Sequence, residues 1–209
     1  MVRIKKLKIT DKIFVLKFKN QYEITSTFLR FQEHYESPKF RRRVFDLDEY
    51  KKWYASINGK FSYYKDWNGF NIPSYVLRPF YDGKFNPLSE KEQKLLNLFK
   101  NERGNFYIVG VHSKIEEKNN LLKHEIAHGL FYTMPHYKKK ILKEIKKFSL
   151  NHLKKELLST GGYSIEVIND ELQAYSLSSS RKLKSKIPKR LKRNINLIFN
   201  EELKSVISK

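Results

Sequence analysis

Residues 121–131 read Leu-Leu-Lys-His-Glu-Ile-Ala-His-Gly-Leu-Phe, an apolar setting that holds two histidines and one glutamate. The stretch predicts the core of a helix that spans about residues 116–132. His124 and His128 are four positions apart, so their side chains share one face of that helix. Two imidazoles on one face can bind a single ion at the Zn–N distance of about 2.0–2.1 Å. The stretch therefore predicts a metal-binding helix.

Glu125 lies one position beyond the first histidine, about 100° around the helix. That offset keeps its carboxylate off the metal but allows contact with a metal-bound water, as a general base requires. Burying two imidazoles and a carboxylate among apolar residues is costly unless they serve a metal or a hydrogen-bond network. We therefore expect these three residues to form a functional site.

The chain has no cysteine, so any metal must be held by His, Asp or Glu. Two histidines and a water leave a tetrahedral zinc site one protein ligand short. A metzincin pattern would need Gly at 131 and His at 134, but Phe131 and Met134 stand there. Several residues remain as candidates for the third ligand. Glu171 on a returning helix is preferred, Asp170, Glu166 and His152 are rivals, and His136 is poorly placed to turn back.

On these residues the chain resembles the gluzincin zinc peptidases, over about residues 105–177. The resemblance is specific at His-Glu-x-x-His and loose at Glu171. It implies a zincin-like fold, one zinc ion, and a third ligand from an Asn-Glu-rich downstream helix, in which a small residue follows the Glu as Ala174 does here. Thermolysin-like members have an Asp four residues after that Glu to orient a histidine, whereas this chain has Tyr175.

The resemblance also implies a mechanism of peptide hydrolysis. In the family, zinc polarises the scissile carbonyl and acidifies a water, while the Glu of the motif, Glu125 here, accepts the proton and passes it to the leaving amine. Candidate donors to the oxyanion are Tyr163, Tyr175 and His152. The apolar segment 105–112 precedes the helix as the edge strand of zincins does, so we expect it to be a strand that aligns an extended peptide, or otherwise a core strand.

The pattern along the rest of the chain predicts an α+β fold with a β-rich amino-terminal half and a helical carboxy-terminal half. Strands are expected near 4–9, 13–16 and 22–31, and helices at 46–57, from Ser89, at 137–158, from about 164 or 169, and at 190–206. The aromatic segment 63–74 is expected to be a loop pinned to the core by Trp67 and Phe70. We divide the chain into a possible substrate-selecting cap (1–100), a zincin-like catalytic core (101–180) and a basic tail (181–209).

Lys and Arg number 43 against 22 Asp and Glu, which gives a net charge of +21. Such a charge favours weak, nonspecific binding to polyanions. No apolar run of the length of a membrane span follows the charged amino terminus, so a cytoplasmic location is expected. Three alternatives to a general peptidase stay open: a cytoplasmic regulatory metallopeptidase that cleaves repressors, a basic nucleic-acid-binding module, and a catalytically silent zincin fold used for protein contacts.

Overall fold

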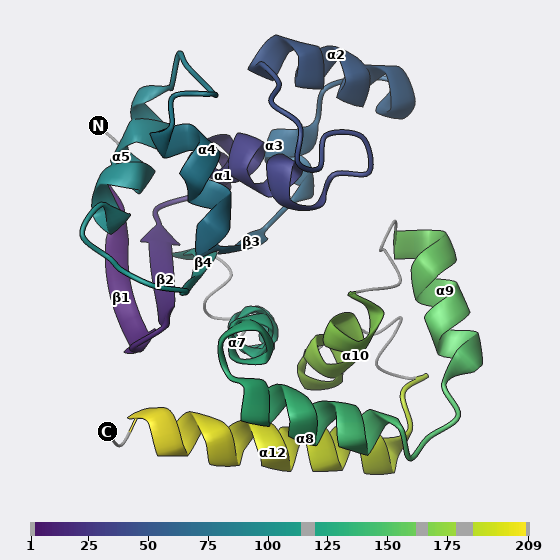
Figure 1. Ribbon diagram of the computed structural model, residues 1–209. Coiled ribbons are helices and arrows are strands. Elements are labelled where there is room, and N and C mark those ends of the chain that lie inside the picture. Colours follow the sequence, from purple (N-terminus) through teal and green to yellow (C-terminus); the bar gives the residue numbers. More distant parts are fainter. Residues whose placement is uncertain (1–2, 114–119, 162–166, 179–185, 208–209) are drawn as a thin grey trace. The chain divides into compact units, whose positions relative to one another are not determined.

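The computed structural model describes residues 3–113, 120–161, 167–178 and 186–207 (Figure 1). The chain divides into two compact units, residues 1–117 and 118–209. The expected segments, by contrast, ended at 100 and 180. The strand at residues 107–112 therefore belongs to the first unit, and the basic helix at residues 189–207 belongs to the second.

The first unit contains a four-stranded mixed sheet in the order β1-β2-β4-β3. The strands are β1 (Lys5–Thr10), β2 (Ile13–Phe18), β3 (Gly69–Pro73) and β4 (Tyr107–His112). β2 and β4 pair in parallel, while β1 with β2 and β3 with β4 pair antiparallel. The strand expected at 105–112 is therefore present, but its expected edge position is wrong. β4 pairs on both sides and is buried along its length, so it has no free edge to offer a peptide.

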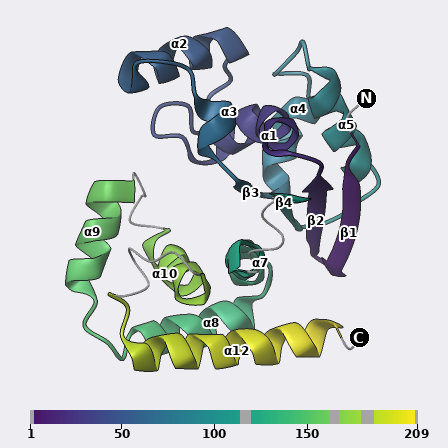
Figure 2. The same cartoon turned by 180° about the vertical axis from the view of Figure 1, so that it is seen from behind.

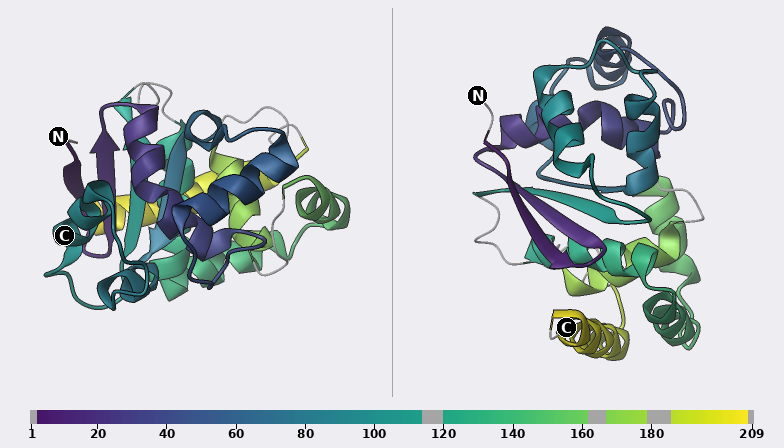
Figure 3. Two further views of the ribbon diagram at one scale, coloured as in Figure 1. Left: turned by 90° about the horizontal axis from the view of Figure 1, so that it is seen from above. Right: turned by 60° about the vertical axis from the view of Figure 1, so that its left-hand side comes forward.

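The expected strand at 22–31 is wrong, because this segment belongs to the helix α1 (Gln21–Glu36). Asn20 caps the helix by accepting a hydrogen bond from the backbone of Glu23. The apolar residues recur at helical spacing and are buried: Ile24, Phe28 and Phe31. α1 contacts β2, β4 and β3 and lies over one face of the sheet (Figure 3). A Cβ at Gly110 of β4 would lie 2.8 Å from the Phe28 ring, so this close contact requires glycine.

Two further helices of the first unit begin within one residue of the positions that the sequence indicated. α2 (Leu47–Asn58) is capped by Asp46 and ends at Gly59, which adopts a left-handed φ of 75°. α5 (Glu90–Phe99) begins with a capping box between Ser89 and Glu92. Between them lie η1 (Ser74–Leu77) and α4 (Arg78–Tyr81). The α+β class is confirmed, but the expected β-rich character of the amino-terminal half is wrong, because more residues of this unit lie in helices than in strands.

A buried ion pair joins α1 to the start of α5. The guanidinium of Arg30 donates from Nε and Nη2 to the two carboxylate oxygens of Glu92, both at 2.6 Å. It also donates to the carbonyl oxygens of Phe85 at 2.9 Å and Pro87 at 3.1 Å. The side chains of the pair are only 8% and 5% exposed, so the hydrogen bonds replace the water that both charges lose.

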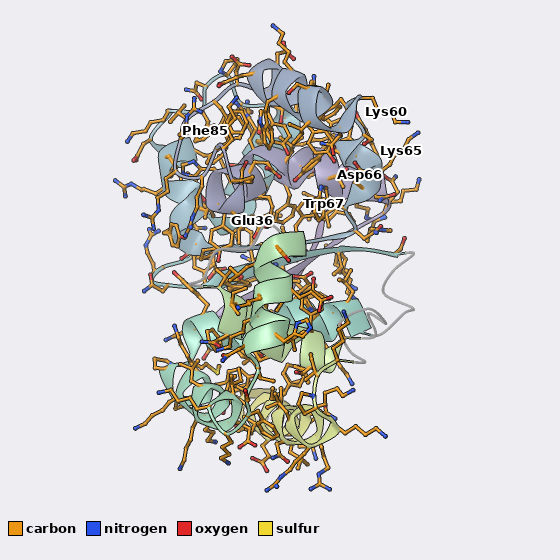
Figure 4. The ribbon with its side chains drawn as sticks, turned by 90° about the vertical axis from the view of Figure 1, so that its right-hand side faces the viewer. Glu36, Lys60, Lys65, Asp66, Trp67 and Phe85 are labelled. Carbon is orange, nitrogen blue, oxygen red and sulfur yellow. The ribbon has the colours of Figure 1, made fainter. Side chains whose placement is uncertain are left out.

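The aromatic segment 63–74 is not a continuous loop. It contains the short helix α3 (Tyr63–Asp66) and then β3. Phe70 is buried as expected, but Trp67 is 51% exposed, so its expected role in pinning the segment to the core is wrong. Figure 4 shows Trp67 beside Asp66, whose carboxylate accepts hydrogen bonds from the hydroxyls of Tyr54 and Ser62.

The described residues of the second unit form helices, as the sequence predicted for this half. The helix expected at 137–158 is two helices, because the chain turns at 146–150 near Ser149 and Asn151, residue types that favour helix ends. Pro135 begins α8, at a position where the first turn of a helix tolerates proline. The helices are α7 (Asn120–Thr133), α8 (Pro135–Ile145), α9 (Asn151–Gly161), α10 (Ile168–Leu177) and α12 (Lys189–Ile207).

Two helix pairs organise this unit. α8 and α12 lie side by side and antiparallel (Figures 1 and 2). Nε2 of His136 is 2.6 Å from Oε1 of Glu202 at one end of this pair, and Asn194 donates to Glu144 at 2.7 Å toward the other. α10 packs against α7. Among the described residues, no helix combines the length and apolarity needed to cross a membrane.

Candidate metal centre

α7 brings the two histidines of the sequence motif together. Nε2 of His124 and Nε2 of His128 are 3.1 Å apart, and their ring centroids are 4.8 Å apart. His128 is buried, with 4% of its surface exposed, and His124 is half-buried. The one-turn spacing thus directs the same ring nitrogen of both side chains toward a common point.

Glu171 joins this pair from α10. One ligand atom from each of His124, His128 and Glu171 lies within 4.8 Å of the others. Oε1 of Glu171 is 3.8 Å from Nε2 of His128. The structure therefore groups the same three residues that the sequence singled out as metal ligands.

The spacing of this group suits a zinc ion. Two ligands at about 2.0–2.1 Å from one tetrahedral ion are separated by about 3.4 Å. The separations of 3.1 Å between the histidine nitrogens and 3.8 Å to Glu171 lie within a few tenths of an ångström of that value. Two imidazoles and one carboxylate are also a ligand set that zinc accepts. The widest separation within the group is up to 4.8 Å, so at least one side chain would have to move closer for all three residues to bind one ion.

Asp170, the rival third ligand, lies at a different ring nitrogen. Its Oδ2 is 3.0 Å from Nδ1 of His128, while Nε2 of that ring faces His124. A carboxylate on the remote nitrogen of a ligand histidine fixes the ring orientation and raises its basicity. The geometry thus favours Glu171 as the ligand and Asp170 as the carboxylate that orients His128. In thermolysin-like enzymes the orienting carboxylate follows the ligand Glu by four positions, where Tyr175 stands in this chain.

The two histidines have opposite electrostatic environments. Burial, and then the positive charge of His128, lower the pKa of His124 to about 3, against a smaller opposing effect of a hydrogen bond with the Ala174 backbone. Burial would also lower the pKa of His128, but the charges of Asp170 and Glu171 outweigh it and raise that pKa to about 10. These opposite shifts favour a neutral His124 and a protonated His128 in the absence of metal.

Glu125 is buried beside this group, with 5% of its surface exposed. Its negative charge also helps to raise the pKa of His128, so it acts on the site electrostatically. It is not a member of the three-residue ligand group, as its position on the helix predicted. A buried carboxylate next to a metal-binding group is available for proton transfer.

Tyr175 contacts the site from α10. Its ring centroid is 4.9 Å from that of His124, with the two rings at 68° in an edge arrangement. It follows Glu171 by four positions, so both side chains lie on the same face of α10. Tyr163, the other expected catalytic tyrosine, and Glu166, a rival ligand, lie outside the described residues.

The remaining histidine candidates do not join the group. His152 is exposed on α9 and is not part of the ligand cluster found among the described residues. His136, as expected, does not turn back to the site and instead pairs with Glu202. Neither residue is supported as a third ligand.

Sequence reasoning missed two polar residues behind the site. Gln173 donates from Nε2 to Oδ1 of Asp170 at 2.9 Å, and the Tyr137 hydroxyl donates to Oε1 of Gln173 at 2.9 Å. Both side chains are fully buried. The sequence gives no local signal for the role of Tyr137, while the signal available for Gln173 is its i,i+3 spacing from Asp170.

No protein-family model, curated protein or solved structure matches the chain.

Proposed function

We propose that this protein is a zinc-dependent metallopeptidase of the gluzincin type, with one zinc ion held by His124, His128 and Glu171 and a zincin-like arrangement around it. The observation that carries the proposal is the convergence of these three side chains, from α7 and α10, to within 4.8 Å. The group offers three protein ligands, whereas a structural zinc site is normally closed by four, so the group fits a catalytic ion better. The buried Glu125 beside it supports the same interpretation, because it can serve as a general base.

When bound, zinc would polarise the scissile carbonyl and acidify a water molecule. The role of Glu125 is to accept a proton from that water and then to donate it to the leaving amine nitrogen. The negative charge that develops on the carbonyl oxygen needs a hydrogen-bond donor. Tyr175 is the favoured donor because of its place beside His124, and Tyr163 remains a second candidate.

Asp170 would orient His128 throughout this reaction. By accepting a hydrogen bond from Nδ1, it leaves Nε2 available to the ion. Several parts of the hypothesis concern properties beyond this site and stay predictions: cytoplasmic location, a protein or peptide substrate, and a substrate-selecting role for residues 1–100. Cleavage of a repressor remains one specific form of the same activity.

Metal content and peptide hydrolysis test the proposal together. Purified protein should contain about one zinc ion per chain and should cleave an unstructured protein such as casein, or a quenched-fluorescence peptide library. Chelation should abolish cleavage, and added zinc should restore it. Zinc binding without cleavage of any peptide would favour the catalytically silent alternative. Indifference to chelators combined with tight nucleic-acid binding would favour the nucleic-acid module.

A further inference from the structure

A chain of hydrogen bonds runs from α8 through α10 to the metal-ligand group on α7. Tyr137 donates to Gln173 at 2.9 Å, Gln173 donates to Oδ1 of Asp170 at 2.9 Å, and Oδ2 of Asp170 is 3.0 Å from Nδ1 of His128. Both oxygens of the one carboxylate are therefore engaged, by groups from two different helices.

The chemistry of Asp170 fixes the direction of every bond in this chain. An ionised carboxylate can only accept, so the amide of Gln173 must present its NH₂ group to Asp170 and its Oε1 to Tyr137. Tyr137 must then be the donor. Burial, followed by the negative charges of Asp170 and Glu202, raises the pKa of Tyr137, so its hydroxyl keeps the proton that it donates. Nδ1 of His128 must likewise carry its hydrogen.

Burial of these hydrogen bonds restricts the orientation of the Asp170 carboxylate. Gln173 and Tyr137 are each 0% exposed, so water does not offer alternative partners to their polar atoms. Rotation of the Asp170 carboxylate would leave the buried amide unsatisfied, which is costly. The amide thus holds Asp170 in the one orientation that serves His128.

We propose that Gln173 and Tyr137 are positioning residues for the metal centre, which hold Asp170 so that His128 presents Nε2 to the ion. This inference rests on the proposed zinc site. Tyr137 acts through Gln173, and Gln173 acts through Asp170, which lies against the ring of His128. Their effect should therefore appear in metal affinity and should depend on Asp170.

The test is the affinity of the purified full-length chain for Zn²⁺, measured by competition with a chromophoric chelator. Gln173→Met keeps the side-chain length and removes both hydrogen bonds, and it should weaken zinc binding about tenfold, as loss of an outer partner does. Tyr137→Phe removes one hydroxyl and should act in the same direction by a smaller factor. Gln93→Met, at an exposed position on α5, is the matched control and should leave zinc affinity unchanged.

A double-mutant cycle separates positioning from general packing. In an Asp170→Ala background, Gln173→Met should weaken zinc binding by less than about twofold, because the residue through which it acts is gone. The visible absorption spectrum of the Co²⁺-loaded protein should also change in Gln173→Met and not in Gln93→Met. An equal loss of affinity with and without Asp170 would overturn the positioning role.

The outcomes keep the two proposals apart. If the unmodified protein binds no zinc, the proposed function fails. If it binds zinc and neither Gln173→Met nor Tyr137→Phe weakens that binding, only the positioning role fails. Thermal unfolding of the metal-free variants checks folding, and if Gln173→Met does not fold, the Tyr137→Phe cycle with Asp170→Ala decides the question.

Discussion

Nδ1 of His128 and Oδ2 of Asp170 lie 3.0 Å apart, on the side of the imidazole ring remote from His124. The neighbouring carboxylate, Glu171, lies instead toward Nε2 of the same ring. Two consecutive acidic residues on α10 thus lie toward different ring nitrogens of the same histidine. Their substitution should have different consequences for metal binding.

Asp170→Asn should weaken zinc affinity about 10- to 100-fold, because it removes a charged partner of a ligand but not a ligand. Glu171→Ala should weaken it further, since two histidines alone would remain. Chelator competition on both variants measures the order. The reverse order, with Asp170 the more damaging position, would make Asp170 the ligand.

Zinc affinity should fall as the pH falls. Ligation requires a neutral imidazole, and the pKa of His128 is raised to about 10, so at neutral pH one proton must leave when zinc binds. Between about pH 6 and pH 8, apparent affinity should rise about tenfold per pH unit, after correction for protonation of the competing chelator. Calorimetry in buffers of different ionisation enthalpy counts the released proton. Asp170→Asn should reduce that count, and a wild-type count of zero would contradict the assigned charge state.

Glu125→Gln should retain zinc and lose hydrolysis. The amide preserves the shape of the side chain but cannot accept the proton of the attacking water. Loss of one general acid–base group should slow cleavage by about 10²- to 10⁴-fold. Zinc content, measured on the same preparation, is the control. Wild-type turnover in this variant would exclude Glu125 as the base.

Arg30→Met should lower the free energy of unfolding by about 3–5 kcal/mol, because it leaves Glu92 buried without its partner. The matched control is Arg78→Met, which removes a pair with Asp82 from a side chain that is 79% exposed. That change should cost about 0–1 kcal/mol. Denaturant unfolding of the two variants compares them. Equal effects would show that burial does not govern this ion pair.

Polyanion binding should be weak, indifferent to sequence and steeply dependent on salt. The logarithm of affinity should fall with the logarithm of salt concentration, with a slope of about −0.9 per phosphate neutralised. Binding to two unrelated duplexes at two salt concentrations measures this. A tight, salt-resistant preference for one duplex would make nucleic acid the principal partner. The exposed lysines on and just after α8 are Lys138, Lys139, Lys140, Lys143, Lys146 and Lys147.

Local signals in the sequence were sufficient for several elements. The caps at Asp46 and Ser89 depend on contacts three residues apart, so the local sequence is enough to locate the starts of α2 and α5. The i,i+4 spacing of His124 and His128 has the same local character. The segment 22–31 was predicted wrongly because a short run of aromatic and β-branched residues suits a strand or a helix, and packing on the sheet decides between them.

The hydrogen bonds of Tyr137 and Gln173 behind the candidate metal centre could not be predicted in the same way. Tyr137 and Gln173 are 36 positions apart and meet only because α8 and α10 pack together. No periodicity in the sequence specifies that meeting. Asp170 was a rival candidate for the third ligand, and whether it is a ligand or an orienting partner depends on which ring nitrogen of His128 it faces.

The place of Glu171 on α10, far along the chain from the α7 histidines, has a consequence for the chain as a polymer. An ion shared by these helices would act as a cross-link that closes a loop through residues 129–170. For a loop of that length, chain-entropy reasoning developed for disulfides gives a stabilisation of about 4 kcal/mol. A protein without cysteine would thereby gain what a disulfide supplies elsewhere, and the stability of its second unit would follow the supply of free zinc.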